Sequence, residues 1–246
     1  MRFLAFPLLL SAGHALLVPS PPGPYSVAVK HFELIDFNRT DALAPRPNTT
    51  RRFMSSVYLP IDAKRECKLQ TVPYMPALTA KVFGQIGEEL GVPQGTLEQF
   101  EMEFCDLATI KLDMATGAEK KQYPVAIFSP GYGGTRLVYG AMARSLASLG
   151  YVVFTVDHTY EASVVQFPDG SDEYSTDTSS GNMTTTLRQL EVRRNTAMYP
   201  TRNRRLTDPT VLADARRGRG IPHLSAFQLD LHVLYLGQLP RHFHSR

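Results

Sequence analysis

Apolar and polar residues alternate in two stretches near the start of the chain, Tyr25 to Phe37 and Arg52 to Ile61. Both stretches are rich in Val, Ile, Tyr or Phe, and a Pro-rich segment, Pro19 to Pro24, precedes the first. Alternation with a period of two, in β-branched and aromatic residues, is typical of strands with one buried face. The pattern therefore predicts two opening antiparallel strands.

A helical period follows between Ala77 and Leu90, where apolar residues recur every four positions. Gly91 and Pro93 lie just beyond and are typical stop signals. The spacing predicts a helix over 77–90 whose apolar stripe is Leu78, Val82, Ile86 and Leu90. A second, shorter amphipathic stretch is expected from the apolar residues Leu97, Phe100 and Phe104.

The segment from Tyr123 to Asp157 has the clearest pattern. Val125 to Phe128 is a short continuous apolar run, as expected for a strand that is buried on both faces, and a Gly-rich loop follows it. A helix is expected from Arg136 to Leu149, capped by Gly150, with Val138, Met142, Leu146 and Leu149 on its buried face. Tyr151 to Val156 completes a β-α-β unit, whose crossover makes its two strands parallel.

Beyond Asp172 the periodicity is lost, first in a polar run from Ser175 to Thr186 and then in an arginine-rich tail. The net charge of +3 is unevenly distributed, because residues 188–246 carry 11 arginines against four acidic residues. We expect this tail, 188–246, to be poorly ordered or irregular, with at most one short strand or helix at Leu229 to Leu236. It is either a polyanion-binding arm or a segment of different coding origin.

The N-terminus has the features of a secretory signal peptide. Arg2 precedes the apolar run Phe3 to Leu10, and the small residues Gly13 and Ala15 follow. We expect 1–15 to be a signal peptide cleaved near Ala15 and 16–187 to form the N-terminal part of one domain. The apolar run is too short to span a bilayer, and no other segment is long enough to do so.

Cysteine and asparagine usage agree with an exported chain. Cys67 and Cys105 are the only cysteines, and an even pair in an oxidising compartment favours a disulfide. Two cysteines without a nearby histidine pair do not supply the ligands that zinc requires. Three Asn-x-Thr sequons predict surface glycans at Asn38, Asn48 and Asn182.

The loop after the first buried strand, Ser129-Pro130-Gly131-Tyr132-Gly133-Gly134, carries the candidate chemistry. In acyl transfer, negative charge develops on the carbonyl oxygen, and preorganised N–H groups aimed at that oxygen lower the barrier. Gly131 and Gly133 allow unusual backbone dihedrals around Tyr132 and close approach of a substrate. The following helix directs its positive end toward the same place. The loop is therefore a candidate oxyanion hole.

The stretch YPVAIFSPGYGGTRLVYGAMARSLASLGYVVFTVDH, followed by TYEASVVQFPDG, resembles the platelet-activating-factor acetylhydrolase family of lipid esterases, particularly its fungal secreted members. The resemblance extends from about Tyr25 to Arg193 and is dense from Tyr123 to Gly170. It implies a truncated α/β-hydrolase fold and a serine-esterase lineage without a cofactor. By position in the motif, Tyr132 carries the backbone N–H of the oxyanion hole.

A dinucleotide-binding loop is the alternative for the same Gly-rich turn, because Asp157 ends the second buried strand and could hold a ribose. The third glycine of that fingerprint is replaced by Arg136, and only one β-α-β unit is present. The dinucleotide interpretation is therefore rejected, and nucleic acid is not an expected partner either.

The catalytic serine of such an esterase is not found, because no G-x-S-x-G occurs in the sequence. Ser129 is a poor substitute, since the Pro130 that follows it has no N–H to share in the oxyanion hole. Asp157 and His158 are adjacent at a strand end and should point to opposite faces, so His158 is expected to order the loop. From Arg194 the chain departs from the family pattern.

The sequence therefore predicts a carboxylic-ester hydrolase lineage for short acyl esters of glycerophospholipids, inactive as written because nucleophile, acid and base are missing. The alternatives are a secreted cutinase-like polyesterase and a non-catalytic remnant whose basic tail binds anionic surfaces. The expected partner is a lipid or other ester, with possible peripheral contact to a lipid surface. Without the nucleophile strand, Val125 to Phe128 is expected to lie at an exposed, association-prone edge of the sheet.

Overall fold

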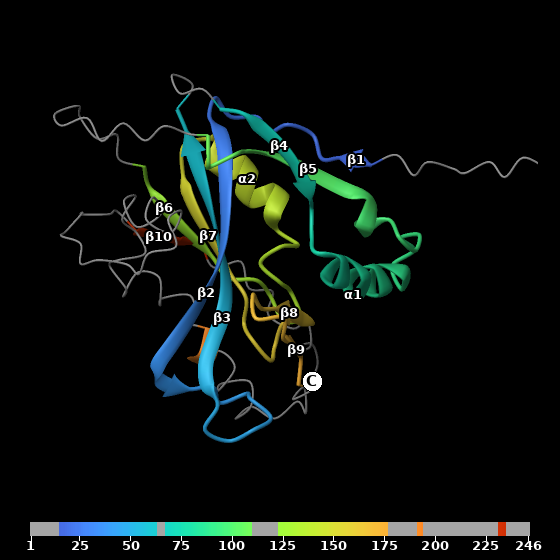
Figure 1. Cartoon of the computed structure of the whole chain (residues 1–246), viewed down its shortest axis with the longest axis vertical. Helices are drawn as coiled ribbons and strands as arrows, with labels where there is room; N and C mark the ends of the chain where they lie inside the picture. Colours follow the sequence, from blue (N-terminus) through green and yellow to red (C-terminus); the bar gives the residue numbers. More distant parts are fainter. Residues whose placement is uncertain (1–14, 63–66, 110–122, 177–190, 194–230, 235–246) are drawn as a thin grey trace, which may run out of the picture.

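The computed structural model describes residues 15–62, 67–109, 123–176, 191–193 and 231–234 (Figure 1). The expected signal peptide, except Ala15, and the sequon at Asn182 lie outside these residues. Most of the 188–246 tail also lies outside the described residues. Its expected disorder therefore stays a prediction.

A twisted five-stranded sheet, ordered β10-β6-β7-β3-β2, forms the centre of the molecule. β2 (Ser26–Thr40) and β3 (Thr50–Ile61) pair antiparallel over most of their length, as the alternating sequence predicted. β6 (Val125–Phe128) and β7 (Val152–Val156) pair in parallel, which confirms the β-α-β unit. β3 joins the two halves of the sheet by pairing antiparallel with β7.

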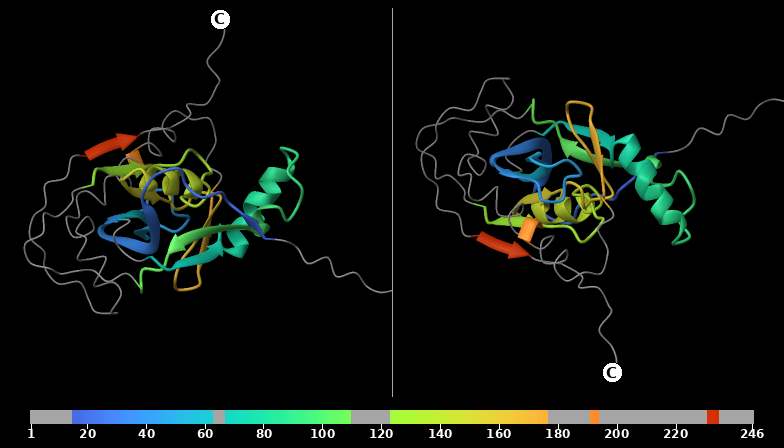
Figure 2. Two further views of the ribbon diagram at one scale, coloured as in Figure 1. Left: turned by 90° about the horizontal axis from the view of Figure 1, so that it is seen from above. Right: turned by 90° about the horizontal axis from the view of Figure 1, so that it is seen from below.

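The strand β6 does not lie at an exposed edge, and that prediction was wrong. β10 (Leu231–Leu234) pairs with it in parallel, in the register Leu231 to Val125 (Figure 2). The four residues of β6 are between 1% and 4% exposed. The tail residues 231–234 thus supply the strand that the sequence analysis considered missing, within the range expected for a short strand or helix.

The helix α2 (Gly140–Ser148) crosses one face of this sheet. It begins four residues later than predicted. Of the residues predicted to be buried, Val138 and Leu146 pack against core clusters, but Met142 and Leu149 do not. Ala143 and Ala147 are fully buried against Tyr58, Val153 and their neighbours, whereas Met142 and Leu149 are 38% and 56% exposed. Small residues face the sheet because they allow the helix to approach it closely. Gly150 ends the helix with φ +100°, as its role as a cap predicted.

A smaller sheet packs beyond α2 and has the strand order β1-β5-β4. Its strands are β1 (Leu16–Leu17), β4 (Leu69–Pro73) and β5 (Phe100–Cys105), with the short 3-10 helix η1 (Leu97–Gln99) before β5. The amphipathic stretch predicted at Leu97, Phe100 and Phe104 is therefore mainly a strand. The buried Met102 and Phe104 alternate with the half-buried Glu101 and Glu103, and this period of two is that of a strand.

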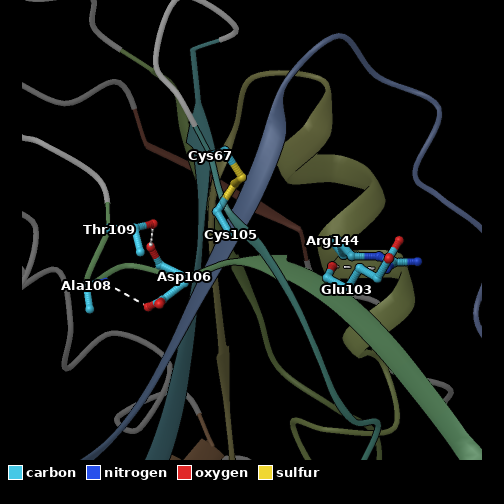
Figure 3. Close-up of a disulfide and its surroundings, with 7 residues drawn as sticks. All are labelled: Cys67, Glu103, Cys105, Asp106, Ala108, Thr109 and Arg144. Carbon is cyan, nitrogen blue, oxygen red and sulfur yellow. Dashed lines mark hydrogen bonds between the residues drawn. A yellow bond between two sulfur atoms is a disulfide. The ribbon is translucent and has the colours of Figure 1, made fainter.

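The predicted disulfide between Cys67 and Cys105 is present, with 5.3 Å between the two Cα atoms (Figure 3). It joins the segment leading into β4 to the end of β5. In the same region the buried side chain of Arg144 donates from α2 to the Glu103 carbonyl at 3.3 Å and also bonds the carbonyls of Val18 and Pro19. The disulfide therefore closes the β4–β5 pair of the smaller sheet, whereas Arg144 attaches this sheet and the chain start to α2.

The helix α1 (Ala77–Glu88) lies to one side of the molecule and confirms the predicted helix, two residues shorter. Thr79 of α1 donates through its backbone N–H and its hydroxyl to the Gln166 side chain, at 3.2 and 2.9 Å. Gln166 ends β8 (Val164–Gln166), which pairs antiparallel with β9 (Asp172–Tyr174). Among the described residues, none of the helices has the length and apolarity needed to cross a membrane.

We predict that the two faces of α2 respond oppositely to changes in side-chain size. Ala147→Leu forces extra volume into a filled interface and should lower the free energy of unfolding by about 1–3 kcal/mol. Met142→Ala on the outer face should change it by less than about 0.5 kcal/mol. Urea unfolding of the disulfide-intact chain measures both. Equal costs would show that Met142 packs inward, as the sequence pattern had indicated.

Candidate active site: the loop between β6 and α2

The loop Ser129–Gly134 leaves the carboxyl end of β6 and contains a tight turn. The Gly134 N–H donates to the Gly131 carbonyl at 3.0 Å, which closes a four-residue turn over Gly131–Gly134. Gly133 has φ +74°, whereas Tyr132 is not in the left-handed region. A positive φ at the third position alone is the signature of a type II turn, and it explains why a glycine stands there.

This turn fixes the direction of the Tyr132 N–H. The Gly131 carbonyl and the Tyr132 N–H belong to one planar trans peptide, so they point in opposite directions. Because the carbonyl points into the turn, toward Gly134, the N–H points out of it. Within the described part of the chain this N–H donates no hydrogen bond, and Tyr132 is 52% exposed. The turn thus presents one free, outward-facing donor.

The segment 158–163, which follows β7, holds the far side of the turn. Ser163 donates to the Gly133 carbonyl through both its backbone N–H and its hydroxyl, each at 3.0 Å. Gly134 lies so close to the start of the loop that an added Cβ would stand 3.1 Å from the Gly131 oxygen. Both contacts restrict the end of the turn at Gly133 and Gly134.

Ser129 and His158 meet beneath the loop. The Ser129 hydroxyl lies 2.8 Å from the His158 Nε2, and the two residues are 5% and 2% exposed. Burial, reinforced by the positive charges of Arg193 and Arg51, holds the pKa of His158 well below its usual value, so the ring is neutral at neutral pH. Its Nδ1 is buried and has no partner among the described residues. Through its bond to Ser129, His158 connects the start of the loop to the chain that follows β7, which agrees with the loop-ordering role expected for it.

Asp157 does not pair with His158, in agreement with the expectation that neighbouring strand residues face apart. Its fully buried carboxylate accepts the Arg136 backbone N–H at 2.6 Å and also the Arg136 guanidinium. The Arg136 Nε further donates to the Ser56 hydroxyl at 3.1 Å. Arg136 thus occupies the carboxylate that the rejected dinucleotide interpretation assigned to a ribose.

A second buried ion pair lies on the other side of the loop. Arg193 donates to the Glu161 carboxylate from Nε at 2.5 Å and from a terminal nitrogen, and to the Pro130 carbonyl at 3.2 Å. Burial raises the pKa of Glu161, although Arg193 acts against this shift. The other carboxylate oxygen of Glu161 has no partner among the described residues.

The loop could be predicted from the sequence, but the residues that hold it could not. Gly131, Tyr132 and Gly133 form one turn, and only Gly133 needs a left-handed backbone. Glu161 and Arg193 were missed because their contacts join segments 32 and 63 residues apart, which no local pattern records. Among the described residues, no cluster of His, Cys, Asp or Glu could hold a metal ion.

The predicted glycosylation sites are accessible where the structure describes them. Asn38 lies exposed near the end of β2, and Asn48 lies exposed in the β2–β3 turn with φ 59°. Asn182 lies outside the described residues.

Comparison with known proteins identifies relatives of this chain. A solved ferulic acid esterase from Streptomyces cinnamoneus superposes with a TM-score of 0.55 at 25% identity, over 90% of this chain and 54% of that one. A protein of Arthroderma benhamiae, named a probable 1-alkyl-2-acetylglycerophosphocholine esterase, is 32% identical over 161 residues. These residues are 63% of this chain and 40% of that relative, so the chain spans about half the length of such proteins or less.

The superposition confirms that the described sheet and helices are part of an α/β esterase fold. The model of the family described as platelet-activating factor acetylhydrolase, isoform II, matches residues 13–207. This match covers most of the chain, and both relatives are named as esterases. The chain therefore belongs to the platelet-activating factor acetylhydrolase isoform II family of carboxylic-ester hydrolases.

Proposed function

We propose that the loop Ser129–Gly134 is the oxyanion side of an ester-hydrolase site, with the Tyr132 N–H as donor. The observation that carries this proposal is the turn geometry, which leaves that N–H free and directed outward while the peptides around it are fixed. Donors that are oriented before the reaction stabilise a developing oxyanion without reorganisation. Gly131 leaves room beside the donor, because no atom lies within 4 Å of where its Cβ would stand.

The proposed ligands are short acyl esters of glycerophospholipids, the class named for the Arthroderma relative. An apolar groove of about 410 Å³ supports a substrate that carries an alkyl chain. Its wall is formed by residues of and just after α1, by Leu97 and Phe100 around the start of β5, and by Val138 and Ala141, which lie just before and within α2. Phe83 and Ile86 line it from α1, and Leu90 lines it from the turn that follows the helix.

We further propose that the chain as written binds such esters without hydrolysing them. Ser129 and His158 resemble a nucleophile and its base, which suggests a second candidate function as a serine dyad. Both side chains are buried, however, and no described residue orients the His158 Nδ1. The dyad therefore lacks substrate access and the acid that a triad requires.

The oxyanion role predicts that a tetrahedral anion binds through the Tyr132 N–H. A short alkyl phosphonate monoester should shift the Tyr132 amide resonance of the disulfide-intact chain. Tyr132→Pro should weaken binding by roughly 10- to 100-fold, the value of a hydrogen bond to a charged group. Proline suits the second position of a type II turn, so this change removes the donor and keeps the turn.

The matched control is Tyr132→Ala, which keeps the N–H and should bind within about threefold of wild type. Equal affinity of the proline variant and wild type would refute the oxyanion role. Hydrolysis of p-nitrophenyl acetate should not exceed that of Ser129→Ala; turnover lost in that variant would establish the dyad instead. Competition by methyl ferulate but not by an alkyl-acetyl glycerophosphocholine would favour an aromatic ester substrate.

The neutral state of buried His158 predicts a loss of stability in acid. Its folded pKa lies below the unfolded value of about 6.5, so below that pH the unfolded chain binds a proton that the folded chain does not. The free energy of unfolding should therefore fall as pH drops from about 7 toward 5, and His158→Gln should flatten this fall. Urea unfolding of wild type and His158→Gln at each pH measures the two free energies of unfolding. The contributions of other titrating groups cancel in the difference between them. Parallel curves would contradict the neutral state.

Secretion is likewise a proposal, supported by the disulfide and by the exposure of Asn38 and Asn48. We expect the mature chain to begin near Leu16 and to carry glycans at these sequons. Intact mass of the protein from a eukaryotic secretory host should fall on glycosidase treatment, and by less in an Asn48→Gln variant. A chain that retains Met1 and does not respond to glycosidase would exclude export.

A further inference from the structure

The buried pair of Glu161 and Arg193 has a position that a salt bridge for stability alone would not require. Its guanidinium lies between a carboxylate on one segment and a loop carbonyl on another. We propose that Arg193 is a positioning residue, which holds the Pro130 carbonyl and thereby sets the direction of the Tyr132 N–H. This inference rests on the proposed role of Tyr132 as the oxyanion donor.

The contacts use the planar fork of arginine. Nε and one terminal nitrogen donate to the same Glu161 oxygen, while the other terminal nitrogen reaches the Pro130 oxygen at 3.2 Å. A guanidinium can make these bonds at once because its five donors are fixed in one plane. A lysine ammonium in the same place could not reproduce that geometry, so Arg193→Lys is the decisive conservative change.

Glu161 is placed by the segment that also holds the turn. The backbone N–H groups of Glu161 and Ala162 donate to the His158 carbonyl, at 3.0 and 2.8 Å, and Tyr160, just before Glu161, has φ 66°. Such a conformation is costly for a tyrosine and persists only where surrounding contacts impose it. Two residues later, Ser163 bonds Gly133. One rigid segment therefore fixes the loop directly through Ser163 and indirectly through Glu161.

The backbone that carries Arg193 is held by contacts of the preceding residue. Its neighbour Val192 is 7% exposed and packs with Leu43 and Tyr160, and the buried Arg51 side chain donates to the Val192 carbonyl. The segment 191–193 is thus docked independently of the loop, so it can act as a fixed support for Arg193.

The Pro130 carbonyl is the last acceptor before the turn. Pro130 has no N–H, and its oxygen sets the plane of the peptide that enters Gly131. Without Arg193, the turn keeps only the Gly134 to Gly131 bond and the Ser163 contacts, and its entrance can rotate. Rotation of the Pro130–Gly131 peptide also reorients the next peptide, which carries the Tyr132 N–H. In the proposed role, Arg193 orients the Tyr132 N–H and does not itself contact the ligand.

The experiment compares the same substitution at two arginines in the full, disulfide-intact chain. Arg193→Lys should raise the Kd of the alkyl phosphonate about tenfold, which corresponds to about 1.4 kcal/mol, and should speed exchange of the Gly134 amide by a similar factor. Arg52→Lys is the matched control, because Arg52 pairs with Glu33, Asp169 and Glu173 and does not touch the loop. It should leave both measurements unchanged.

A double variant distinguishes a change in the orientation of the Tyr132 N–H from a general loss of structure. In the Tyr132→Pro background, Arg193→Lys should cost no further affinity, since its effect acts through an N–H that is already absent. Additive losses, or equal effects at Arg193 and Arg52, would overturn the inference. Should Arg193→Lys fail to fold, Glu161→Gln replaces it and should cause a smaller change of the same kind; no change would overturn the inference.

The two proposals fail differently. If wild type shows no phosphonate-induced shift of the Tyr132 amide, the oxyanion role is refuted. Gly134 exchange then still decides whether Arg193 holds the turn, and an exchange rate unchanged in Arg193→Lys would refute that role on its own.

Discussion

A fully buried carboxylate lies at the end of β7, and much of the site follows from the need to neutralise it. Asp157 accepts both the backbone N–H and the guanidinium of Arg136, so the chain that leaves β6 must return to the neighbouring strand within seven residues of Ser129. A buried charge that lost its partner would be strongly destabilising. This pairing therefore limits where the loop can lie and where α2 can begin.

The same constraint explains why α2 starts at Gly140, although the apolar spacing favoured Arg136. Arg136 is held by Asp157, and residues 136–139 form turns before the helix begins. The helix then approaches the sheet with Gly140, Ala143 and Ala147, residues that contribute little to a hydrophobic stripe. A pattern that weighs large apolar side chains therefore selected Met142 and Leu149, which face outward. Close packing of small residues is visible only once the partner strand is known.

Local signals were sufficient wherever local contacts decide the conformation. Val125 to Phe128 and the start of α1 at Ala77 were predicted correctly, because continuous burial and a four-residue period each determine one structure. The Gly-rich loop was found for the same reason. Contacts between distant segments left no such signal: the pairing of β10 with β6, the Ser129 to His158 bond and the Arg193 support all join residues that the sequence keeps apart.

The disulfide has a consequence for limited proteolysis. Cys67 and Cys105 are 38 residues apart and enclose β4, α1 and most of β5 in a covalent ring. The most open part of that ring is the turn from Gly91 to Gly95, where both glycines have positive φ and no atom lies within 4 Å of either added Cβ. A protease that cuts there would open the ring without releasing a fragment. The nicked protein would run as one species until a reductant separated its two pieces.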